Sequence, residues 1–133
     1  GSEMCIRDSV MNVKEKRIIL VDDSIVRGTT SDIIIRLLRN AGAKEIKMCI
    51  SSPPVRFPCF FGIDTAQRRQ LVAASHSEEE ICKMIGADKL HYLSQKGLAE
   101  SISRIRAKDM CFACFDGDYP EPVPGGGLDG MKE

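Results

Sequence analysis

The stretch RIILVDDSIVRGTT, residues 17–30, joins an apolar run to two adjacent acids and a loop rich in hydroxyl groups. Its first part, residues 18–21, is continuously apolar and rich in β-branched residues, which predicts a strand buried on both faces of a parallel sheet. The run stops at Asp22. Ligands of open parallel sheets bind outside the carboxyl ends of the strands, so we expect a binding site at the acidic pair.

The residues after the loop predict a helix and a second strand. Apolar side chains recur at the spacing of one helical face, at Ile34, Leu37, Leu38 and Ala41. Thr30 or Ser31 suits the helix N-cap, and Gly42 suits the stop after the last turn. Residues 46–50 form a second β-rich run, and a strand–helix–strand unit of this kind is parallel and right-handed. The sequence therefore predicts an α/β fold with a parallel sheet.

The second half of the chain predicts more helix than strand. Ser77 and Glu80 have the spacing of a capping box, which opens a helix. Residues 90–93 suit a short strand, and Ser94 can cap a last helix that reaches about Ile105.

Composition divides the chain into three segments. Residues 1–9, GSEMCIRDS, show no periodicity and are interpreted as an N-terminal remnant unrelated to the rest of the chain. Residues 10–120 carry the periodic segments and form the folded part. Residues 121–133 are rich in Pro and Gly and predict a flexible tail.

Composition also excludes several classes of partner. The 133 residues have zero net charge and 5% aromatic residues with no Trp, so we expect no surface for nucleic acid. No apolar run approaches the roughly 20 residues that span a bilayer, and the N-terminus lacks the layout of a signal peptide. We therefore expect a cytoplasmic protein that does not bind membranes, with its six cysteines reduced.

The loop after the acids carries the groups of an anion site. Free N–H groups and the dipole at a helix N-terminus favour a phosphate, and Gly28 allows close backbone approach. Hydroxyl donors come from Ser24, Thr29 and Thr30. Two carboxylates beside a phosphate would repel it unless they bind something else, such as ribose hydroxyls or Mg²⁺. The stretch thus predicts one ligand with both a phosphate and a sugar diol.

The acidic pair has two other interpretations. Asp22 and Asp23 can be turn and capping residues alone, which acids at strand ends often are. A phosphoacceptor receiver domain also has an acidic pair after its first strand, but it needs a further Asp at the end of a later strand. The second strand here ends in residues 51–54, Ser-Ser-Pro-Pro, which supply none.

The stretch ILVDDSIVRGTT resembles the phosphoribosylpyrophosphate (PRPP) motif of type I phosphoribosyltransferases, and its ending DSIVRGTT is similar to that of the amidophosphoribosyltransferase family. The resemblance continues through AGAKEIKMCISSPPVRFPCFFGIDT, HSEEEICKMIGADKLHYLS and CFACFDGDYP, over about residues 13–120. It implies the parallel-sheet type I phosphoribosyltransferase fold, here its C-terminal part, with a helical C-terminal region.

The resemblance also implies a reaction and its binding residues. The family transfers glutamine-derived ammonia to C1 of PRPP, giving 5-phosphoribosylamine and pyrophosphate at the entry to de novo purine synthesis. Asp22 and Asp23 would bind the ribose hydroxyls and the Mg²⁺–PRPP complex. The residues around the 5′-phosphate would be Ser24, Ile25, Val26, Arg27, Gly28, Thr29 and Thr30. Purine nucleotide inhibitors can occupy the same loop, and the full-length enzyme is expected to be a homo-oligomer.

The family's glutaminase domain and the transferase's flexible loop have no match here. We therefore expect this segment alone to make no phosphoribosylamine. The alternative, from another class of protein, is a PRPP- or nucleotide-sensing module without catalysis.

Three cysteines suggest a metal centre. Cys111 and Cys114 have the C-x-x-C spacing that lets two thiolates reach one metal, although buried structural thiols fit equally well. Cys59, in a proline-bounded loop, can supply a third thiolate. The resemblance implies a structural 4Fe-4S cluster at these positions in one branch of the family, with a fourth ligand upstream of this chain.

Overall fold

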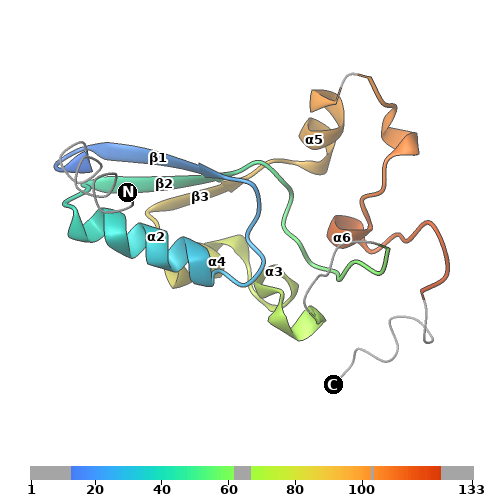
Figure 1. Cartoon of the computed structure of the whole chain (residues 1–133), viewed down its shortest axis with the longest axis horizontal. Coiled ribbons are helices and arrows are strands. Elements are labelled where there is room, and N and C mark those ends of the chain that lie inside the picture. Colours follow the sequence, from blue (N-terminus) through green and yellow to red (C-terminus); the bar gives the residue numbers. More distant parts are fainter. Residues whose placement is uncertain (1–12, 62–66, 103, 124–133) are drawn as a thin grey trace, which may run out of the picture.

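The structure is a computed structural model that describes residues 13–61, 67–102 and 104–123 (Figure 1). The expected remnant at residues 1–9 and all but the first three residues of the expected tail lie outside the described residues.

Three parallel strands form the sheet. They are β1 (Arg17–Asp22), β2 (Glu45–Ile50) and β3 (Lys89–Tyr92), and they lie in the order β1-β2-β3. Asp22 pairs in register with Ile50, which in turn pairs with Tyr92, so all three strands end at one edge. The predicted α/β class and parallel pairing are confirmed.

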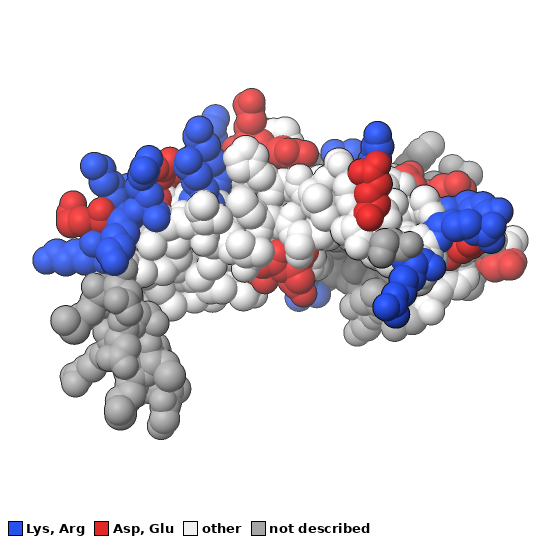
Figure 2. Space-filling view, turned by 90° about the horizontal axis from the view of Figure 1, so that it is seen from above, with Lys and Arg blue, Asp and Glu red and all other residues white. Residues whose placement is uncertain are grey.

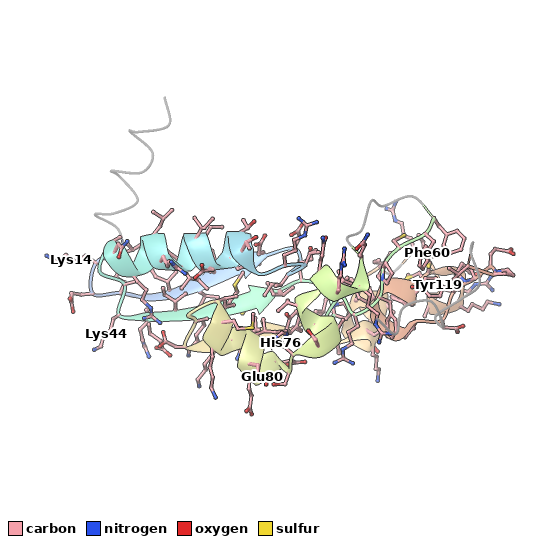
Figure 3. All side chains as sticks on the ribbon, turned by 90° about the horizontal axis from the view of Figure 1, so that it is seen from below. Lys14, Lys44, Phe60, His76, Glu80 and Tyr119 are labelled. Atoms are coloured by element: carbon pink, nitrogen blue, oxygen red, sulfur yellow. The ribbon has the colours of Figure 1, made fainter. Side chains whose placement is uncertain are left out.

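Helices α2 (Thr29–Asn40), α3 (Val72–Ser75) and α4 (Glu78–Met84) lie on the same side of the sheet (Figures 1 and 3). The core forms between them and the sheet. Its fully buried side chains include Ile35 of α2, Ile46 and Met48 of β2, and Ile81 of α4.

The opposite face of β1 is open, and the predicted burial on both faces is wrong. Ile19 and Val21 are each 67% exposed, whereas Ile18 and Leu20 pack against the core. Helices α2, α3 and α4 all lie on the other side of the sheet, so within the described residues the side chains of Ile19 and Val21 stay exposed to solvent. Seen from above, the middle of the molecule has few charged side chains, and Lys and Arg lie mainly toward its two ends (Figure 2).

Most predicted helix ends are confirmed. Ser77 and Glu80 form the capping box, with Glu80 N donating to Ser77 Oγ at 3.2 Å and Ser77 N donating to Glu80 Oε2 at 2.7 Å. Gly42, with φ 91°, follows the C-cap of α2. The predicted N-cap of α2 is wrong: the cap is Gly28, because the helix begins before Thr30 and Ser31.

The C-terminal region is helical, as the family resemblance implied, but more broken than the sequence indicated. Ser94 caps α5 (Gln95–Ser101) by accepting from Gly97 N at 3.0 Å. The helix ends at Ser101 instead of about Ile105, because Ile102 has the non-helical angles φ −100° and ψ 75°. Four short elements were not predicted, namely η1 (Arg68–Gln70), α3, η2 (Ala107–Asp109) and α6 (Ala113–Asp116).

Among the described residues, no helix combines the length and apolarity that crossing a bilayer requires.

Candidate functional site

The acidic pair lies where β1 ends. Asp22 is the last residue of the strand, and its carbonyl oxygen accepts from Ser51 N at 3.0 Å and from Ser51 Oγ at 3.1 Å. Ser51 directly follows β2. The two neighbouring strand ends are thereby tied together, which fixes the backbone from which both carboxylates project.

Each carboxylate uses one oxygen for its own turn. Asp23 N donates to Asp22 Oδ1 at 2.9 Å, and Ser24 N donates to Asp23 Oδ1 at 2.6 Å. The turn role that the sequence allowed is therefore real. Within the described residues neither Oδ2 atom has a hydrogen-bond partner. One oxygen on each acid remains available to a ligand, so the structural and binding roles are compatible.

The middle of the loop is held from the inside. Ile25 is 2% exposed and belongs to the core. Val26 O accepts from Val72 N at 2.9 Å, and Arg27 Nη2 donates to Gln70 Oε1 at 2.7 Å. Sequence patterns gave no indication of the contacts from residues 70 and 72, since nothing local marks a partner 43 positions away.

The loop enters α2 through a left-handed residue. Gly28 has φ 79°, a region that side chains disfavour, and as N-cap it offers no side-chain acceptor to the first turn. The first helical hydrogen bond runs from Asp32 N to Gly28 O at 3.0 Å. The N–H groups of Thr29 and Thr30 therefore lack helical acceptors, the condition under which a helix N-terminus binds an anion.

The first turn of α2 carries no unpaired negative charge that would repel an anion. Its one acid, Asp32, is paired with Arg36 at 2.8 Å. Thr29 and Thr30 are exposed, whereas Ser31 is buried. The nine predicted binding residues, 22–30, thus form one continuous segment from the last residue of β1 to the first two residues of α2, at the carboxyl edge of the sheet (Figure 1).

The proline-rich loop after β2 is bound to α6. Arg56 N and Phe57 N both donate to the carbonyl oxygen of Cys114, at 2.9 and 3.0 Å. Tyr119 Oη donates to Pro58 O at 2.7 Å, and the Tyr119 ring lies 5.3 Å from that of Phe60 (Figure 3). These contacts bring the segment containing Cys59 to the C-x-x-C segment.

Cys59 and Cys111 each lie close enough to Cys114 for their charges to act on its thiol. Burial raises the pKa of the Cys114 thiol, and the charges of Cys59 and Cys111 raise that pKa further. Even so, the described residues contain no group of three or more His, Cys, Asp or Glu side chains arranged to hold a metal ion. Thiolates are suitable ligands for an iron–sulfur cluster, but their present arrangement does not form a finished site.

Known proteins resemble this chain over most of its length. It is 52% identical to amidophosphoribosyltransferase from Archaeoglobus fulgidus over 115 residues, or 86% of this chain and 25% of the relative. The enzyme of the same name from Bacillus subtilis is 52% identical over 84% of this chain and 24% of its own length. The chain belongs with the amidophosphoribosyltransferases. It spans about a quarter of the curated relatives that it matches, in their C-terminal part.

Solved structures of this family share the fold. One, described as the allosteric regulatory enzyme of purine biosynthesis, matches with TM-score 0.82 and 48% identity over 90% of this chain and 26% of that chain. Glutamine PRPP amidotransferase from B. subtilis, complexed with ADP and GMP, matches with TM-score 0.81 and 46% identity over 93% of this chain and 28% of that one. The type I phosphoribosyltransferase fold is thereby confirmed. A scan of protein-family models gave no match.

Proposed function

We propose that this chain is part of the phosphoribosyltransferase domain of an amidophosphoribosyltransferase and that residues 22–30 bind PRPP. One observation carries the proposal: two carboxylates at the end of β1 lead, through the left-handed Gly28, into a helix without a side-chain cap. The whole enzyme would transfer glutamine-derived ammonia to C1 of PRPP, giving 5-phosphoribosylamine and pyrophosphate. That reaction is the first step of de novo purine synthesis.

Different groups of the chain bind different parts of the ligand. The N–H groups of Thr29 and Thr30, with the loop hydroxyls, donate to the 5′-phosphate. The free Oδ2 atoms of Asp22 and Asp23 accept from the ribose hydroxyls. These carboxylates also suit Mg²⁺, which when bound offsets the negative charge of pyrophosphate. Positioning and electrostatic stabilisation of the leaving group then account for catalysis without a dedicated acid or base.

The proposal extends to regulation and assembly. The relative from B. subtilis was solved with ADP and GMP. We infer that purine nucleotides occupy the same loop of this protein through their phosphates, and that the full-length enzyme is a cytoplasmic homo-oligomer. Residues 10–120 would be the enzyme's domain segment, with residues 1–9 and 121–133 outside it.

We also propose that Cys59, Cys111 and Cys114 ligate a 4Fe-4S cluster, with a fourth ligand from outside this chain. The proximity of Cys59 and Cys111 to Cys114 supports it. Iron and sulfide analysis of the full-length protein after anaerobic purification tests this proposal, and protein without bound iron contradicts it.

Isothermal titration of the chain with Mg²⁺–PRPP tests the binding site. Asp23→Asn should weaken binding by about tenfold or more, because a neutral amide is a poorer partner for ribose hydroxyls and Mg²⁺. Asp109→Asn is the matched control, since that exposed acid pairs with Arg106 in a different region. Equal affinity of Asp23→Asn and the unaltered chain would count against the proposed role.

Assays of turnover separate the enzyme from a non-catalytic sensor. We expect the 133-residue chain to bind PRPP but to form no phosphoribosylamine from ammonia, and the full-length protein to form it. A full-length protein that binds PRPP without turnover would favour the sensor.

A further inference from the structure

Residues 70–72 hold the proposed phosphate loop at two points. Val72 N donates to Val26 O at 2.9 Å, and Gln70 Oε1 accepts from Arg27 Nη2 at 2.7 Å. One contact fixes the loop backbone and the other fixes its single guanidinium group. The shape of the loop therefore depends on an element that is distant in sequence.

Residues 70–72 are held in place by burial and by a backbone hydrogen bond. Leu71 is 1% exposed and Val72 is also buried, and Val72 lies in the same core cluster as Ile25 of the loop. The backbone of Gln70 is fixed as well, because its N–H donates to Gln67 O at 2.7 Å. Because this backbone is already ordered, holding Arg27 in place costs only the rotamer entropy of the two side chains.

The chemistry of the acceptor is as informative as its position. Arg27 forms no ion pair with the described residues. A carboxamide oxygen accepts from a guanidinium without cancelling its charge, whereas a carboxylate would neutralise it. The positive charge of Arg27 thus stays available to an anion bound in the loop.

We propose that Gln70 is a positioning residue for phosphate binding, which acts by orienting Arg27 while leaving its charge uncompensated. This inference rests on the proposed function, in which residues 22–30 hold the phosphate of PRPP. It adds Gln70, from outside the loop, to the residues that affect phosphate binding. It also gives a reason why the side chain at this position is neutral.

The test compares two substitutions that separate orientation from charge. Gln70→Leu removes the acceptor, and Gln70→Glu keeps an acceptor but adds a negative charge. Both should weaken Mg²⁺–PRPP binding by about threefold to tenfold, with unfolding temperatures unchanged. Only Gln70→Glu should also flatten the dependence of affinity on KCl concentration. Gln67→Glu is the matched control, because it adds the same charge nearby without contacting Arg27.

Two further measurements distinguish positioning from a general structural effect. The side-chain N–H signals of Arg27 in NMR spectra of the free chain should exchange slowly with water, and Gln70→Leu should abolish that protection. In an Arg27→Ala background, Gln70→Leu should cause no additional loss of affinity.

The outcomes are separable. If the unaltered chain does not bind Mg²⁺–PRPP, the proposed function fails and this inference falls with it. If it binds, and both Gln70 variants bind equally well, only the inference is overturned. Additive losses in the Arg27→Ala background would also overturn it, because Gln70 would then act without Arg27.

Discussion

Gly28 shows how a single residue serves both the fold and the proposed site. Its φ of 79° turns the chain from the loop into α2. A Cβ atom there would meet Ile85 Cγ2 at 3.6 Å, which is ordinary van der Waals contact. The requirement for glycine therefore comes from backbone strain rather than from lack of space.

Replacing Gly28 should test this distinction. Gly28→Ala is expected to lower the free energy of unfolding by about 1 kcal/mol, because alanine disfavours the left-handed region. Gly28→Asn should lower it less, since asparagine adopts positive φ more readily. Urea denaturation followed by circular dichroism measures both. An alanine variant as stable as the unaltered chain would show that the turn relaxes to another conformation.

At the scale of elements, Asp88 joins α2 to the sheet. Its Oδ2 atom accepts from Ile46 N at 2.7 Å, at the start of β2, and from Arg39 Nη2 at 2.6 Å, near the end of α2. Arg39 also donates to Gly86 O at 3.2 Å. The backbone hydrogen bond from Ile46, followed by the contact with Arg39, lowers the pKa of Asp88 below its ordinary 3.8.

Asp88→Ala should lower the free energy of unfolding by about 1–2 kcal/mol, because the N–H of the buried Ile46 loses its acceptor. The effect should depend on pH. Since the pKa of Asp88 is lower in the folded state, its stabilisation is complete above the unfolded pKa near 4 and is lost as pH falls through the folded value.

Denaturation at neutral pH and in the acid range checks this prediction. The difference in the free energy of unfolding between the unaltered chain and Asp88→Ala should become smaller in acid. Asp109→Ala is the control, because its exposed pair with Arg106 should change stability by less than about 0.5 kcal/mol. If the difference in the free energy of unfolding stays constant down to low pH, the stabilisation does not depend on the carboxylate charge of Asp88.

The parts of this fold that local patterns determine could be predicted from the sequence. The apolar run before Asp22 indicated β1, and the spacing of Ser77 and Glu80 indicated the start of α4. The end of α5 could not be predicted, because Ile102 and Ile105 continue an apolar spacing but remain 40% and 52% exposed.

The proposed site, too, could be predicted from the sequence only in part. Residues 22–30 are contiguous, so the motif alone placed them together. The contribution of Gln70 was missed because its meeting with Arg27 depends on how the intervening strand and loops fold back. Burial of β1 on both faces was inferred from its composition, but coverage depends on which elements pack there.

On the scale of the whole molecule, β1 provides a comparison of the two sheet faces at adjacent positions. Ile18 packs against the core, whereas Ile19 points to the open face and is 67% exposed. The two residues have the same side chain and the same strand backbone. Differences between their variants therefore report on the environment of each face.

Ile18→Thr should lower the free energy of unfolding by about 1–2 kcal/mol, because it places a hydroxyl in a core position and removes apolar volume. Ile19→Thr should change it by less than about 0.5 kcal/mol in the isolated chain. Urea denaturation compares the two. A large loss from Ile19→Thr would mean that the open face is covered in solution, and sedimentation velocity would then show association.

The strand order has a consequence for how the chain is made. β1, β2 and β3 are neighbours in the sheet in the same order in which they occur along the chain. During synthesis from the N-terminus, β2 leaves the ribosome after β1, with which it pairs, and β3 leaves after β2. The sheet can therefore grow at one edge as the chain emerges, and the turn at Asp22 is already made when Ser51 arrives to fix it.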